Sequence, residues 1–88
     1  MDIIKFKNDI YEALQNKYTI EIHYSNCINF KEKTINWKYP PYKIKSTNLE
    51  YIIDEIQTYF KNFLDFVIIM HIFNKNNLVN KIPLNIPI

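Results

Sequence analysis

The chain has 88 residues, of which 48% are hydrophobic, and a formal net charge of +2. This length indicates a single domain, residues 1–88, and the hydrophobic share excludes a disordered tail. The small charge lacks the basic excess of a dedicated DNA-binding protein. No apolar run approaches the roughly 20 residues of a membrane-spanning helix, so we expect no membrane partner.

Three residue types dominate the composition. Ile, Asn and Lys make up 40 of the 88 residues, while Gly and Arg are absent. The common types have AT-rich codons, which indicates an AT-rich genome, such as that of a low-GC bacterium, its phages or its mobile elements. Without Arg, sequence-specific reading of the DNA major groove is not expected, because Arg supplies the two-pronged contact to guanine. The single Cys27 and the charged N-terminus favour a cytoplasmic protein.

A first helix is predicted from Asp2, a candidate N-cap, to about residue 17. Its inner stripe holds apolar residues at helical spacing: Ile3, Phe6, Ile10, Ala13 and Leu14. Asn16 is the candidate for the left-handed residue that closes this helix.

Two strands are predicted next. Residues 18–24 alternate between apolar and polar side chains, with the even-numbered ones inward. Residues 27–31 continue as a second strand, with Ile28 and Phe30 inward. The apolar phase then moves to odd positions from Ile35 onward, which requires a bulge or a tight loop over 31–34. Either one long bent hairpin arm or two short strands satisfies this pattern.

Pro40 and Pro41 end this strand region, because neither has a backbone donor. Residues 42–46 are predicted to connect it to the clearest helix of the chain, 47–63. Seven apolar residues lie on one stripe of that helix: Leu49, Ile52, Ile53, Ile56, Tyr59, Phe60 and Phe63. Thr47 and Glu50 are predicted to form a capping box at its start.

Residues 66–73 form an uninterrupted apolar run, which predicts a central strand covered on both faces. After a turn at 74–77, the tail from Leu78 to Ile88 carries apolar residues at even positions and prolines at odd ones, which predicts an edge strand. The predicted fold is α+β, in the order α-β-β-(β)-α-β-β. It is an antiparallel sheet with two helices packed on one face.

The best candidate for a binding site is segment 35–45, which mixes aromatic, Lys and Pro residues. Its candidate site residues are Trp37, Lys38, Tyr39, Tyr42, Lys43 and Lys45. Aromatic rings beside lysines can stack bases and hold phosphates, and the same residues suit a protein interface. The alternative is structural, with Trp37 packed in the core and a solvated connection after it.

A catalytic or metal site is not predicted. His23, Cys27 and His71 are the only soft ligands, and their spacing is loose for zinc, so histidines of the core or of a sheet face are the better interpretation. No nucleophile with a neighbouring base, no Gly-rich phosphate loop and no nuclease carboxylate pattern is found. We therefore expect a protein that is not an enzyme and that uses no cofactor.

The C-terminal tail is a second candidate surface. Its apolar residues Ile82, Leu84, Ile86 and Ile88 lie on a predicted open edge, which can pair with another chain by strand addition. A homodimer formed through this edge, or through an early strand, is one hypothesis.

The leading hypothesis is a small non-enzymatic binding protein that acts through protein–protein contacts. It is expected to be an inhibitor of a host defence system, encoded by a phage or a mobile element, with another protein as its partner. The alternative is a nucleic-acid-binding module that uses segment 35–45. Salt separates the two, because binding to phosphates weakens steeply with salt and binding through buried aromatic anchors does not.

Overall fold

The structure is a computed structural model that describes residues 3–84. Within that range the chain forms two helices and six strands, in the order α1 (Ile3–Gln15), β1 (Thr19–Ser25), β2 (Ile28–Asn29), β3 (Thr34–Ile35), β4 (Tyr42–Ile44), α2 (Leu49–Phe60), β5 (Val67–Asn74) and β6 (Asn77–Leu84). The predicted α+β class is confirmed.

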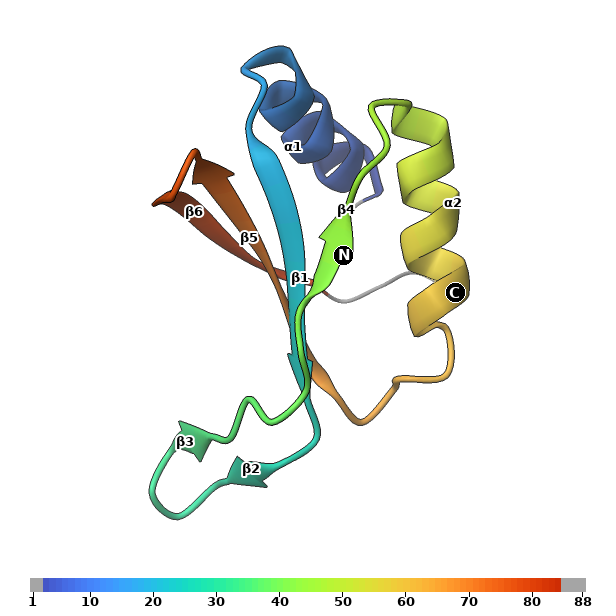
Figure 1. Ribbon diagram of the computed structural model, residues 1–88. Helices are drawn as coiled ribbons and strands as arrows, with labels where there is room; N and C mark the ends of the chain where they lie inside the picture. The colour runs from blue at the N-terminus through green and yellow to red at the C-terminus, as the bar shows by residue number, and fades with distance from the viewer. Residues whose placement is uncertain (1–2, 85–88) are drawn as a thin grey trace.

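Four strands form one antiparallel sheet in the order β4-β1-β5-β6. β5 is a central strand, as predicted for residues 66–73. Strands β2 and β3 pair with each other in a separate two-stranded arm, which projects beyond one end of the sheet (Figure 1). We call residues 26–38 the arm.

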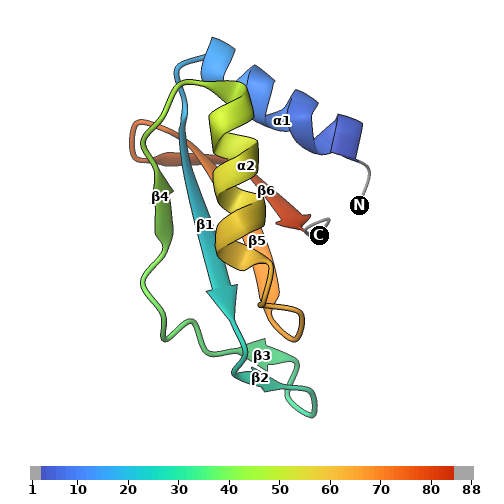
Figure 2. The same cartoon turned by 90° about the vertical axis from the view of Figure 1, so that its right-hand side faces the viewer.

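Both helices pack on the same face of the four-stranded sheet, as predicted (Figure 2). The side chains between the helices and the sheet form one core, which contains Phe6, Ile10, Ala13, Ile20, Ile22, Tyr24, Ile52, Ile53, Ile56, Phe60, Ile68, Met70, Ile72 and Leu84. The predicted cover on both faces of 66–73 is wrong. The odd-numbered side chains of β5 are only half-buried, because both helices lie on the other face.

Helix α1 follows its predicted stripe, since Phe6, Ile10 and Ala13 are buried. Its predicted cap Asp2 lies outside the described residues. The left-handed residue after the helix is Lys17, with φ of 58°, and not Asn16. The Asn16 side chain instead donates to the Glu12 carbonyl at 2.9 Å.

Helix α2 begins later and ends earlier than predicted. Its N-cap is Asn48, whose Oδ1 accepts a hydrogen bond from the Tyr51 amide at 2.9 Å. The predicted capping box of Thr47 and Glu50 is therefore wrong by one residue. Asn48 has the extended backbone of an N-cap, and its own side chain reaches the free amide of the first turn. The helix ends at Phe60, after which the chain turns.

We expect Asn48→Ala to lower the free energy of unfolding by about 1 kcal/mol, the usual cost of losing an N-cap side chain. Thr47→Ala is the matched control and is expected to change it by less than about 0.5 kcal/mol. Urea unfolding followed by far-UV circular dichroism measures both. A larger loss of stability in Thr47→Ala than in Asn48→Ala would contradict this assignment and support the capping box of Thr47 and Glu50.

The arm differs from its prediction. It contains two short strands of two residues each, which is one of the two alternatives that the pattern allowed. Phe30 lies in the turn between them with 82% of its surface exposed, so its predicted inward position is wrong. The predicted tight loop is present, and Lys33 closes it with φ of 56°.

Strand β4 was not predicted, because Pro40 and Pro41 precede it and it has only three residues. It pairs with β1, placing Tyr42 opposite Ile22 and Ile44 opposite Ile20. Residues 42–44 therefore belong to the sheet, where a solvated connection was expected.

Strand β6 is the predicted edge strand, since among the described strands it pairs only with β5. The pairing contains a bulge: Asn80 lies opposite Ile72 and Leu78 opposite Phe73, which leaves Val79 unpaired. Side chains before the bulge therefore point to the opposite face of the sheet from the one that strict alternation would give them, because the extra residue shifts the alternation by one. Leu78 therefore lies on the opposite face from Ile82 and Leu84, and not with them as predicted.

Candidate binding face of the sheet

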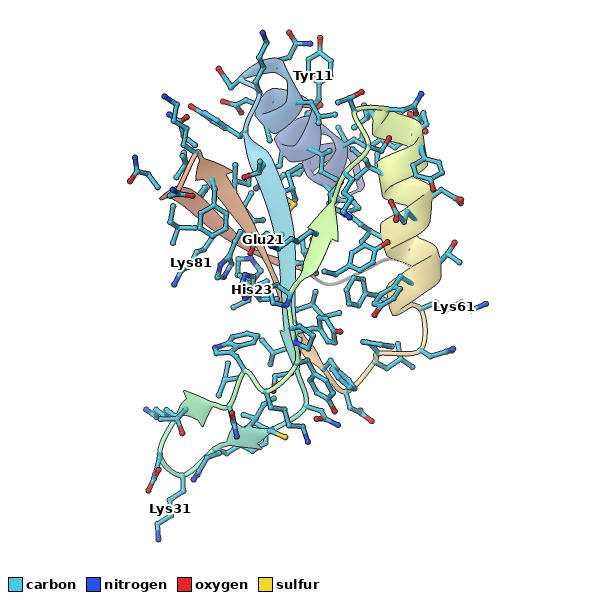
Figure 3. All side chains as sticks on the ribbon, in the orientation of Figure 1. Tyr11, Glu21, His23, Lys31, Lys61 and Lys81 are labelled. Carbon is cyan, nitrogen blue, oxygen red and sulfur yellow. The ribbon has the colours of Figure 1, made fainter. Side chains whose placement is uncertain are left out.

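Within residues 3–84, no helix covers the second face of the four-stranded sheet. We call it the open face. By strand alternation and register it consists of Thr19, Glu21 and His23 of β1, Lys43 of β4, Val67, Ile69, His71 and Phe73 of β5, and Leu78, Lys81 and Pro83 of β6. Glu21, His23 and Lys81 lie together on the side of the sheet away from α2 (Figure 3).

Charged side chains form a row across the open face. Glu21 lies opposite Lys43 on one side and opposite His71 on the other, and His71 lies opposite Lys81. Directly opposed residues of antiparallel strands have neighbouring side chains. The row therefore has a lysine at each end, with Glu21 and His71 side by side between them.

Two histidines stack at the middle of this face. The rings of His23 and His71 have centroids 3.8 Å apart and planes inclined by 20°. The Nε2 of His23 lies 3.3 Å from the Glu21 carboxylate. Trp37 meets His23 edge-on at 6.3 Å, and 40% of the Trp37 surface is exposed. The indole thus borders the open face instead of entering the core.

The pKa of His71 is lowered below its ordinary value. Burial of the ring is the main cause, and the charges of His23 and Lys81 act in the same direction, while Glu21 opposes them. Each of these groups faces His71 from β1 or β6. The neutral imidazole is therefore the form that the folded protein favours.

A pH dependence of stability follows from this lowered pKa. The unfolded chain takes up a proton at the ordinary His pKa of about 6.5, before the folded protein does. The contribution of His71 to stability is complete above that pH and is lost as the pH falls toward the lowered value. We expect urea midpoints to decrease between about pH 7.5 and 5.5, and His71→Phe to reduce this slope. An unchanged slope in the variant would assign the effect to other groups.

The predicted segment 35–45 divides between two faces of the molecule. Trp37 and Lys43 lie on or beside the open face. Tyr39 and Tyr42 turn the other way and pack against the core, with Tyr39 stacked on Tyr24 at a centroid distance of 5.4 Å. The two remaining lysines are exposed, Lys38 with its ammonium 5.2 Å from the Tyr39 ring centroid and Lys45 just beyond β4.

Tyr42 is held on the helix side by two contacts. Its hydroxyl donates to the Glu55 carboxylate of α2, and its ring stacks on Tyr59 at 4.4 Å. Burial, followed by the contact with Glu55, raises the pKa of Tyr42 to about 12. Tyr42 therefore remains a neutral donor at neutral pH and ties β4 to α2.

The structure describes two of the four candidate edge residues, Ile82 and Leu84. Ile82 is half-buried against the core and Leu84 is buried, so their side chains face the helices. Ile86 and Ile88 lie outside the described residues. What β6 offers to another chain is its backbone edge, next to Lys81 and Pro83.

The soft ligands are brought together in part. His23 and His71 meet on the open face, as sheet-face histidines, whereas the Cys27 thiol lies 3.5 Å from the Asn26 side chain. Across residues 3–84, no group of three or more His, Cys, Asp or Glu side chains is arranged to hold a metal ion.

Sequence reasoning missed the open face as a unit. Glu21 and His23 fall on the polar side of one predicted strand, and His71 on the odd side of another. Alternation gives these facings, but only the register between β1 and β5 brings the three side chains together.

No protein-family model matches the chain, and no curated protein matches it. Neither α1 nor α2, the helices within residues 3–84, has the length and apolar character needed to cross a membrane.

Proposed function

We propose that this protein is a small non-enzymatic binding protein that acts through protein–protein contacts made by the open face. The observation that supports this most is the position of Trp37, which is 40% exposed beside a helix-free sheet face. Tryptophan is among the residues that dominate the energy of protein interfaces.

The composition of the open face also supports a protein partner. Half-buried Ile69 and Phe73 provide apolar surface between the charged positions, and the half-buried histidine pair adds flat rings. Lys43 and Lys81 lie at the two ends of the charged row. Apolar and aromatic groups with lysines at the margins are features of many protein interfaces.

The specific form of the proposal is an inhibitor of a host defence system, encoded by a phage or a mobile element and acting in the cytoplasm. The many residues with AT-rich codons support this origin, and the single cysteine supports this compartment.

Truncation of Trp37 tests the proposal. We expect Trp37→Ala to weaken binding to a partner captured from the host by about 30-fold or more, as a hot-spot tryptophan does. Tyr11→Ala is the matched control, because Tyr11 is similarly exposed on α1, away from the open face (Figure 3). Capture with tagged protein, followed by titration of the purified partner at two salt concentrations, measures the change. Equal binding by the two variants would contradict the proposal.

A second candidate is a nucleic-acid-binding module. It is favoured by the lysines at both ends of the charged row, Lys43 and Lys81, and by Trp37 and Phe73 as stacking surfaces beside the histidine pair. Titration of Trp37 fluorescence with single-stranded DNA and RNA tests it. Binding that falls steeply between about 50 and 200 mM salt would favour this candidate over a protein partner.

A further inference from the structure

The arm holds a large aromatic ring out in water on an ordered turn. Phe30 is 82% exposed at its tip. Asn29 organises the turn, since its Oδ1 accepts hydrogen bonds from the amides of Lys31 and Glu32, each at 3.1 Å. The ring is therefore presented by a formed structure, so little ordering would oppose its burial in a partner.

A shallow hollow lies between α2 and β4. Its volume is about 260 Å³, and it is lined by Tyr42, Tyr51, Asp54, Glu55, Thr58 and Tyr59. A cavity of about 150 Å³ is enough to hold benzene, so this hollow can admit a phenyl ring. Tyr51 is 59% exposed at its border, and the stacked rings of Tyr42 and Tyr59 offer an aromatic wall.

The charges around the two features are complementary. Lys31 and Lys33 follow Phe30 in the arm, with Glu32 between them, so this turn carries one net positive charge, whereas Asp54 and Glu55 border the hollow. Within residues 3–84, the side chains of Lys31, Lys33 and Asp54 take part in none of the ion pairs. A second hollow shares Tyr42, Tyr51 and Glu55 and extends toward Lys43 and Lys45, so the acidic side is the α2 side.

We propose that the protein forms a homodimer in which the arm of each copy inserts Phe30 into the α2 hollow of the other. The arm, whose turn contains Phe30, projects beyond the end of the sheet and away from α2 (Figure 1), so we assign the hollow to the arm of a second copy. Reciprocal insertion uses the same two surfaces on both copies, which closes the assembly as a two-fold dimer.

The edge of β6 is a poorer site for self-association. It carries Lys81, Pro83 and the bulge at Val79, and each of these features blunts edge-to-edge pairing of strands. The arm and the hollow carry no such obstacle.

Sedimentation equilibrium over a range of protein concentrations tests the proposal. We expect a reversible dimer for the wild type, and Phe30→Ala to raise its dissociation constant about 30-fold or more. Leu64→Ala is the matched control, because Leu64 is an exposed apolar residue that belongs to neither surface. A wild type that stays monomeric, or a Phe30→Ala dimer as tight as the wild type, would overturn the proposal.

A charge exchange identifies the two surfaces. Lys31→Glu with Lys33→Glu in the arm, or Asp54→Lys at the hollow, should each weaken the dimer. All three substitutions in one chain should recover affinity, because opposite charges again face each other. If the triple variant instead shows the sum of the separate losses in dimer affinity, the proposed contact between the arm lysines and Asp54 is wrong. Lys81→Ala, on the open face and outside both the arm and the hollow, should leave the dimer unchanged, which keeps this proposal separate from the function of the open face.

Discussion

Replacing Phe60 by Ala is expected to remove about 3–5 kcal/mol from the free energy of unfolding, the largest loss among the substitutions considered. Phe60 is 2% exposed and lies where α2 meets the sheet. Domains of this size have a total stability of about 5–15 kcal/mol. The variant should therefore lie close to the unfolding threshold at room temperature.

The magnitude follows from the contacts of this ring. Its centroid lies 4.7 Å from that of Tyr59, 5.2 Å from Phe63 and 5.3 Å from Tyr24, in T-shaped arrangements. Truncation removes the buried area of the ring and leaves a cavity that these large neighbours cannot fill without leaving their own contacts.

Phe30→Ala is the matched control for this prediction, because it deletes the same atoms from a side chain that is 82% exposed. Urea unfolding at low protein concentration, where any dimer is dissociated, should show a change within about 0.5 kcal/mol for Phe30→Ala. A loss below about 1 kcal/mol for Phe60→Ala would mean that the core closes around the missing ring.

These two phenylalanines show how far sequence patterns reach. Phe60 belongs to a stripe repeated over four turns, so its burial was predictable from spacing alone. Phe30 lies in an interval where the alternation changes phase, and the pattern could not tell a strand from a turn. The Asn29 side chain decides this locally by accepting two turn amides.

The same limit applies to the candidate site. Alternation assigned His23 to the polar side of its strand, whereas the uninterrupted 66–73 run predicted cover on both faces and gave His71 no distinct side. Their stacking depends on the register of β1 against β5, which is fixed by the whole core. Likewise, Pro40 and Pro41 correctly indicate a break in the chain. They do not predict the three-residue strand after them, because that strand depends on its pairing with β1, a tertiary contact.

The Ser25→Ala substitution is expected to give a second large effect, a loss of about 1–3 kcal/mol, although it deletes a single oxygen atom. Ser25 is fully buried at the base of the arm. Its hydroxyl donates to the Asn36 carbonyl at 2.6 Å and accepts from the Cys27 amide at 3.0 Å. Removing it leaves both backbone groups short of a partner in a part-buried setting, which costs more than an exposed hydrogen bond.

This hydroxyl joins the two chain segments that enter and leave the arm, where the Asn36 amide also donates to the Cys27 carbonyl at 2.9 Å. We therefore expect hydrogen exchange in Ser25→Ala to accelerate at the arm amides more than in β1 or β5. Ser46→Ala is the control, because its hydroxyl accepts only an exposed amide bond from Asn48. Uniform acceleration through the whole sheet would show that Ser25 supports the core and not the arm. Selective acceleration, together with a weaker dimer, would show that the fixed base of the arm is what allows Phe30 to act as an anchor.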